Sequence, residues 1–164
     1  MIITPLLIIF NIIVFILVFL FINTIDKRKW LTILVSIILT PIVYFYAFYP
    51  FVNIFSSYHH QKYFKAELWV EKPALRYELI DDIIETDTLI GKTKNEIKTL
   101  LGNYEWLGWN ASKKAHDETI WNYSLGIKPG AFNSKKECLM LVFKNNKTEA
   151  IKTFKEDLKL NAKE

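Results

Sequence analysis

The residues best suited to chemistry are few, and they lie far apart in the sequence. They are three histidines, one cysteine and two adjacent aspartates: His59, His60, His116, Cys138, Asp81 and Asp82. Neighbouring side chains on a helix point about 100° apart, so His59 and His60 do not form the chelating pair that a spacing of four residues would give. A nucleophile and base built from Cys138 and His116 remains geometrically open.

The wider sequence offers little support for catalysis. Its 164 residues contain no glycine-rich phosphate loop, no metal-ligand spacing and no Gly-x-Ser-x-Gly turn. Cys138 opens the apolar run Cys138–Phe143, which is typical of a small side chain buried in a strand. We therefore expect a protein that is not an enzyme and that uses neither a metal nor another cofactor.

Aromatic side chains suggest binding instead. Four of them fall in one stretch and form the candidate partner-binding surface: Tyr104, Trp106, Trp109 and Trp121. Large aromatic side chains anchor many protein interfaces, so this stretch predicts contact with a protein partner. The alternative is that several of them fill the core of a small domain.

The elements that would carry these residues begin with two apolar stretches. Residues 2–25 and 31–52 contain no charged side chain, and about 20 apolar helical residues cross a bilayer. Pro41 is tolerated in such a span. The first stretch lacks the basic start and the small-residue cleavage site of a signal peptide, so we expect residues 1–52 to form an uncleaved transmembrane hairpin.

The loop between the two stretches predicts the orientation. Lys27, Arg28 and Lys29 follow Asp26, and short loops rich in Lys and Arg stay in the cytoplasm. These three basic residues therefore predict a multi-pass protein of the cytoplasmic membrane whose C-terminal domain lies outside the cytoplasm. Lys62 and Lys65 oppose this bias in part.

The charge pattern limits the classes of partner. Half of the formal net charge of +4 comes from the basic loop, and the remaining charges mix both signs. Nucleic-acid binding favours dense Lys and Arg on one face, so we expect no nucleic-acid partner. The expected partners are the lipid bilayer and a protein of the cell envelope.

The sequence predicts a juxtamembrane connector over residues 53–72 and a small α+β domain over residues 73–164. One helix is expected to start at Pro73, and a second runs from the Thr93–Glu96 capping box to a left-handed cap at Gly102. The strands expected are 119–125, 139–144 and 147–154, with a turn at Asn145-Asn146. The predicted fold is two helices packed on a three-stranded antiparallel sheet, and residues 103–118 add either a short strand or an exposed loop.

The order of these motifs resembles the SmpA/OmlA (BamE-like) family over residues 89–152. The resemblance is carried by Leu89–Gly102, then Trp121-Asn122-Tyr123, then Leu139–Lys147. It implies a two-layer α+β domain that binds other proteins. The best-known members of the family are lipoproteins held by a lipidated cysteine, whereas this chain carries two apolar stretches instead.

These observations favour a non-catalytic binding or scaffolding protein at the outer face of the cytoplasmic membrane. Two alternatives remain. In one, the protein is an accessory subunit that acts through its hairpin. In the other, it is a lipid- or ligand-binding module whose connector aromatics lie at the bilayer.

Overall fold

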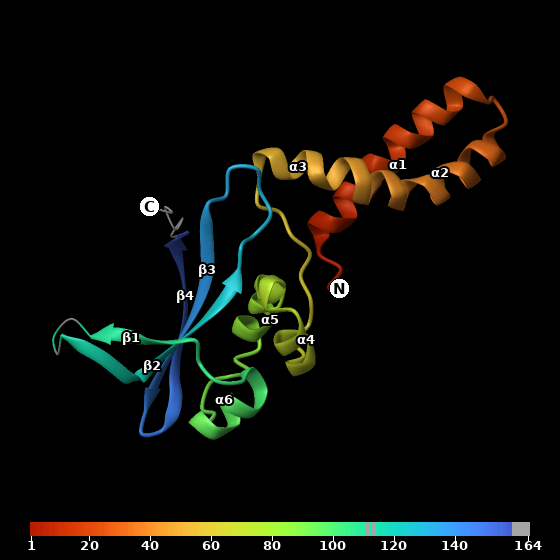
Figure 1. The fold of residues 1–164 in the computed structure, drawn as a ribbon. Coiled ribbons are helices and arrows are strands. Elements are labelled where there is room, and N and C mark those ends of the chain that lie inside the picture. The colour runs from red at the N-terminus through yellow and green to blue at the C-terminus, as the bar shows by residue number, and fades with distance from the viewer. Residues whose placement is uncertain (111, 113, 159–164) are drawn as a thin grey trace. The chain divides into compact units, whose positions relative to one another are not determined.

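The computed structural model describes residues 1–110, 112 and 114–158 and divides the chain into two compact units (Figure 1). The hairpin unit comprises Met1–His60 with Pro129–Phe132, and the sheet unit comprises Gln61–Lys128 with Asn133–Glu164. The boundary between His60 and Gln61 falls inside the expected connector. Each unit is described by itself below.

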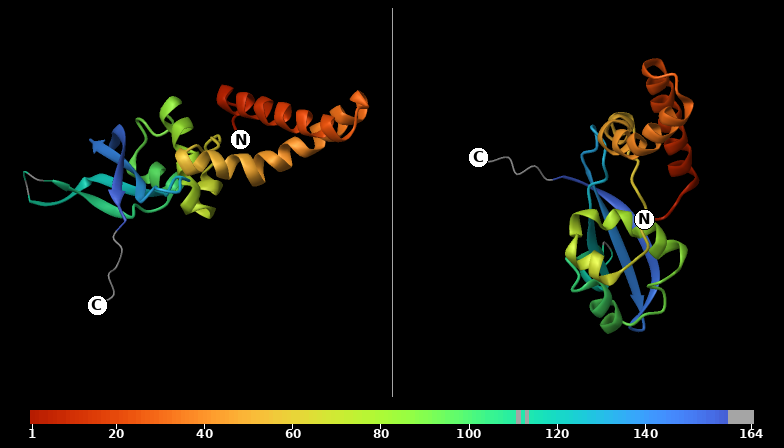
Figure 2. Two further views of the ribbon diagram at one scale, coloured as in Figure 1. Left: turned by 90° about the horizontal axis from the view of Figure 1, so that it is seen from above. Right: turned by 90° about the vertical axis from the view of Figure 1, so that its right-hand side faces the viewer.

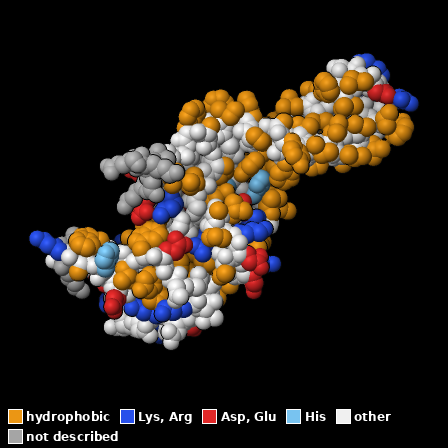
Figure 3. Space-filling view, in the orientation of Figure 1, with side chains coloured by type: hydrophobic (Ala, Val, Ile, Leu, Met, Phe, Trp, Pro, Cys, Tyr) orange, Lys and Arg blue, Asp and Glu red, His pale blue; other side chains and the backbone are white. Residues whose placement is uncertain are grey.

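The hairpin unit is helical. Its elements are α1 (Pro5–Ile25), α2 (Lys29–Val43), a π-helical turn η1 (Tyr44–Phe48) and α3 (Tyr49–Phe55). Helix α1 and the continuous helical stretch Lys29–Phe55 are both long and apolar enough to cross a membrane, and only 17% and 22% of their most apolar windows are buried. In Figure 3 apolar side chains cover the visible surface of this hairpin, and charges appear at its tip.

A row of small polar side chains lies buried along α2. Thr32, Ser36 and Thr40 recur every four residues on α2 and are at most 8% exposed. Their hydroxyls donate to backbone carbonyls one turn earlier in the helix, so they need no partner on α1. Val14 and Val18 of α1 are buried as well.

The sheet unit carries four helical segments and four strands. Its elements are α4 (Ala66–Glu71), a 3₁₀ helix η2 (Pro73–Glu78), α5 (Ile80–Glu85), α6 (Lys94–Leu101), β1 (Trp106–Asn110), β2 (Ala115–Gly126), β3 (Lys135–Lys144) and β4 (Lys147–Asp157). The strands form one antiparallel sheet in the order β1-β2-β3-β4. Helices α4, α5 and α6 lie beside this sheet (Figure 1).

The α+β class and the two apolar helices are as expected, but the count of elements differs. The sheet has four strands, so the prediction of three is wrong, and the strand alternative for residues 103–118 holds for β1. The single helix expected from Pro73 is a 3₁₀ helix followed by the short α5. Backbone of η2 packs directly on β2, because a Cβ built on Gly126 would lie 2.1 Å from the Ala74 carbonyl oxygen.

Local sequence patterns are confirmed at the start of α6 and at the last turn, but not at the end of α6. Thr93 and Glu96 form the reciprocal capping box, and Asn145 and Asn146 have φ of 50° and 62°. Gly102 has φ 79° but ψ −169°, so it ends α6 outside the left-handed helical region that was expected. Glycine alone adopts that combination readily.

Candidate binding surface

The two faces of the sheet are chemically different. Helix-facing side chains of β2 and β3 belong to the core: Trp121, Tyr123, Leu125, Leu139, Leu141 and Phe143. The strand register places another set of apolar side chains on the opposite face, outside that core: Trp106, Ile120, Met140, Val142, Ala150 and Phe154. All six are half-buried, and we call this second set the uncovered face because it lies outside the core.

The four predicted aromatic residues do not form one patch. Trp121 is 3% exposed and lies in the core, 4.7 Å from the ring of Phe143, with its indole N–H donating to the Glu118 carbonyl oxygen. Tyr104 packs on Trp121 at 5.0 Å. Trp106 pairs with Asn122, the residue next to Trp121, and so lies on the uncovered face.

Trp109 belongs to a third location, a two-stranded arm. Gly108–Asn110 pair with Ala115–Asp117, whereas β3 begins to pair with β2 only at Ile120. The arm therefore extends beyond the rest of the sheet, as Figures 1 and 2 show. Trp109 is 61% exposed there, and its ring lies 5.5 Å from that of His116.

One edge of the uncovered face carries a charge cluster that the sequence pattern did not indicate. The Lys136 ammonium lies 4.5 Å from the Trp106 ring centroid and 3.2 Å from the Glu156 carboxylate. A cation between an aromatic face and a carboxylate fixes the position of both neighbours. Lys136 thus contacts both Trp106 and Glu156 at one edge of the surface.

A groove adjoins this edge. It has a volume of about 470 Å³ and is lined by apolar and polar residues of η2 and the strand ends, among them Pro73, Glu105, Ser124, Ile127 and Lys136. Concave sites of this kind combine apolar walls with a few placed polar groups.

Arg76 positions the acidic wall of that groove. Its Nη1 donates to Glu105 at 2.6 Å and to the Ser124 carbonyl oxygen at 3.1 Å, while Nε donates to the Trp69 carbonyl oxygen at 2.8 Å. The Arg76 side chain is 10% exposed, so these bonds replace water that it has lost.

One polar atom on the uncovered face is left unsatisfied. Asn122 is 2% exposed, and its Oδ1 accepts no hydrogen bond from the described residues. Cys138 lies on the same face and is buried, and burial raises the pKa of its thiol to about 11. A thiol with that pKa is a poor nucleophile at neutral pH.

The histidines and aspartates occupy separate places. His60 stacks on Tyr49 at 4.8 Å and its Nε2 lies 2.9 Å from the Tyr44 hydroxyl, whereas His116 lies on the arm. Asp81 accepts from Gln61, and Asp82 accepts from the Phe64 backbone N–H. Among residues 1–110, 112 and 114–158, no group of three or more His, Cys, Asp or Glu is arranged to hold a metal ion.

Comparison with protein-family models, with curated proteins and with solved structures finds no match. The resemblance to the SmpA/OmlA family therefore stays a prediction from the motif order.

Proposed function

We propose that this protein is a membrane-anchored, non-catalytic binding protein whose sheet unit contacts a protein partner in the cell envelope. The observation that carries the proposal is the uncovered face, where Trp106, Met140, Val142 and Phe154 lie outside the core on one side of the sheet. Apolar side chains gathered outside a core are typical of protein interfaces.

The anchor in this proposal is the pair of apolar helices. Lys27, Arg28 and Lys29 keep the loop in the cytoplasm, which leaves the sheet unit on the outer face of the cytoplasmic membrane. A BamE-like domain displayed there would act by contact with another protein. A carbonate wash of isolated membranes, together with protease access from the outer side of the cytoplasmic membrane, tests the anchor and the orientation.

The binding surface is tested by site-specific photo-cross-linking of the full chain in cells. A photo-reactive residue at Met140 reports on the uncovered face, and the same residue at the exposed Asn95 of α6 is the control. We expect one discrete adduct from position 140, lost on Trp106→Ala, and none from position 95. Equal labelling at both positions, or an adduct unaffected by Trp106→Ala, contradicts the proposal.

The same experiment separates the alternatives. A protein adduct that forms only from probes placed in α1 or α2 favours the accessory-subunit function. Adducts with lipid in place of protein from position 140 favour the lipid-binding module.

A further inference from the structure

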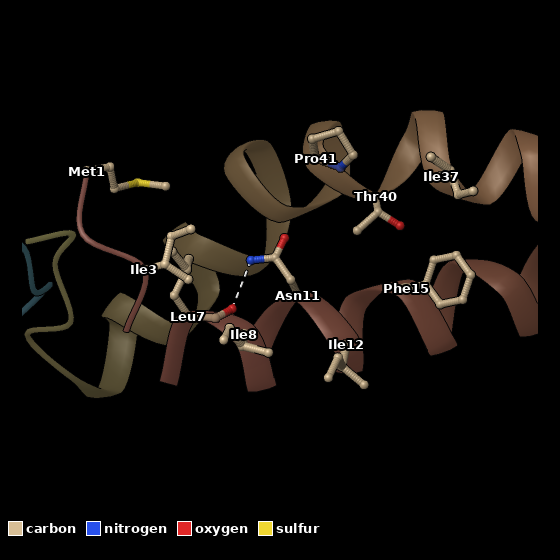
Figure 4. Close-up of a pocket in the computed structure, with 10 residues that line it drawn as sticks. All are labelled: Met1, Ile3, Leu7, Ile8, Asn11, Ile12, Phe15, Ile37, Thr40 and Pro41. Carbon is tan, nitrogen blue, oxygen red and sulfur yellow. Dashed lines mark hydrogen bonds between the residues drawn. The ribbon is translucent and has the colours of Figure 1, made fainter. Parts of the chain in front are cut away.

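A groove runs between the two apolar helices of the hairpin unit. It has a volume of about 520 Å³, and its walls are almost wholly apolar (Figure 4). Residues from the first half of α1 line one side, including Ile8, Ile12 and Phe15, and Ile37 and Pro41 of α2 line the other. The groove thus lies in the half of the hairpin away from the basic loop.

Asn11 is the polar side chain that this groove contains on α1. Residues 5–22 hold no other polar side chain, and Asn11 lies six residues, or about 9 Å, inside the start of α1. At that depth in a bilayer no water is present to satisfy a carboxamide. Hydrogen-bond partners must come from protein.

Within the hairpin, only one of the hydrogen-bonding groups of the Asn11 carboxamide has a partner. Asn11 Nδ2 donates to the Leu7 carbonyl oxygen at 2.9 Å, within its own helix. Figure 4 shows Oδ1 turned toward Pro41, which has no N–H to donate. No donor among the described residues reaches this oxygen, and Nδ2 retains a second hydrogen.

The other polar side chains of the two helices differ from Asn11 in this respect. Thr32, Ser36 and Thr40 each donate to a carbonyl in their own helix. Asn23, near the end of α1, accepts from the Lys29 ammonium at 2.8 Å. Within α1 and α2, the side-chain acceptor left without a donor therefore lies at the groove. Asn53 of α3, outside the groove, has the same pattern: its Nδ2 donates to the Tyr49 carbonyl oxygen and its Oδ1 has no partner among the described residues.

We propose that the groove is a self-association site in which α1 of a second copy of this chain packs and the two Asn11 carboxamides pair. A carboxamide carries both a donor and an acceptor, so two copies related by a two-fold axis satisfy each other. A lipid chain fills the same volume but offers no hydrogen bond. This inference rests on the proposed membrane anchor.

Cysteine cross-linking of the full chain in native membranes tests the site. In a Cys138→Ser background, Ile12→Cys places a thiol in the groove, and Ile13→Cys places one at nearly the same depth on another side of α1. We expect oxidation to give a disulfide-linked dimer with Ile12→Cys and several-fold less with Ile13→Cys.

The role of the carboxamide is tested in the same assay. Asn11→Leu should lower the Ile12→Cys dimer about fivefold, the effect of roughly 1 kcal/mol of interhelical hydrogen bonding. Asn23→Leu is the matched control and should leave the dimer unchanged. Equal cross-linking at positions 12 and 13, or no response to Asn11→Leu, overturns the proposal and leaves the groove to lipid.

A carbonate wash of the same membranes distinguishes the two kinds of failure. Release of the protein by the wash would contradict the membrane anchor and hence the proposed function. Retention of the protein in the membrane without a disulfide-linked dimer would contradict only the self-association site.

Discussion

The guanidinium of Arg76 lies 4.8 Å from the Trp69 ring and donates to the carbonyl oxygen of the same residue. Arg76 comes from η2 and Trp69 from α4, and Arg76 also reaches Ser124 of β2. One side chain therefore joins two helical segments to the sheet. The interaction explains how a polar group with little exposure is retained beside the core.

Replacing this arginine should destabilise the sheet unit. Arg76→Met leaves Glu105 and two carbonyl oxygens without their donor, which we expect to cost about 2–4 kcal/mol in the free energy of unfolding. Urea unfolding of the full chain in detergent micelles, followed by tryptophan fluorescence, measures it. The control Lys144→Met breaks the exposed pair with Glu149 and should cost less than about 0.5 kcal/mol. Similar losses in the two variants would contradict the role of Arg76.

The close approach of η2 and β2 predicts intolerance at Gly126. Gly126→Ala combines φ of +90° with a Cβ 2.1 Å from the Ala74 carbonyl oxygen, so backbone must move. Gly91→Ala is the control, because Gly91 has φ of +75° but nothing within 4 Å of its Cβ. Gly91→Ala should cost about 1–2 kcal/mol, the penalty for the left-handed backbone alone, and Gly126→Ala distinctly more. Equal unfolding midpoints in urea would contradict the packing.

The capping box of α6 predicts a pH-dependent contribution to stability. Hydrogen bonds from the backbone N–H and hydroxyl of Thr93 lower the pKa of Glu96 below its usual value. A lowered folded-state pKa means that the stabilisation is present above the unfolded pKa, about 4.3, and is lost as the pH falls through the folded value.

Glu96→Gln provides the comparison, since glutamine also serves in a capping box but does not titrate. The parent chain should be the more stable of the two at pH 7, and the difference should shrink toward pH 3. Thermal unfolding of both proteins across this range measures it. A gap that stays constant with pH would show that the Glu96 charge contributes nothing.

Cys138 should be unreactive in the folded protein. A pKa of about 11 leaves roughly 300-fold less thiolate below pH 8 than an unperturbed thiol with a pKa near 8.5. We expect the reaction of the native chain with a thiol reagent at pH 7.5 to be at least about a hundredfold slower than that of Ser134→Cys in a Cys138→Ser background. Comparable rates would contradict the burial of the strand.

What the sequence predicted well is what depends on neighbouring residues. The Thr93–Glu96 box and the Asn145-Asn146 turn each form within four residues, so their chemistry is visible in the printed sequence. The apolar helices are also local, because length and composition define them. These features needed no knowledge of the tertiary structure.

The face on which a strand residue lies depends on its partners. Trp106 and Trp121 read alike in the sequence, yet the register places one outside the core and the other within it. For residues 103–118 the sequence left a strand and a loop as alternatives, and the pairing of β1 with β2 is irregular: its register shifts between Leu107 and Gly108, and three residues of β2 lie between their partners Trp121 and Asp117. Nothing in the sequence around Lys136 indicated its contact with Trp106, because the two residues lie on different strands, β3 and β1.

The tight packing at Gly108 offers a mark by which distant relatives can be recognised. Any side chain at this position would meet Ile120, whose Cγ2 lies 2.3 Å from the place a Cβ would take. A larger residue at position 108 therefore requires Ile120 to move. Homologues too divergent for overall similarity are expected to retain a glycine here, ahead of the Trp-Asn-Tyr motif, as a trace of common descent.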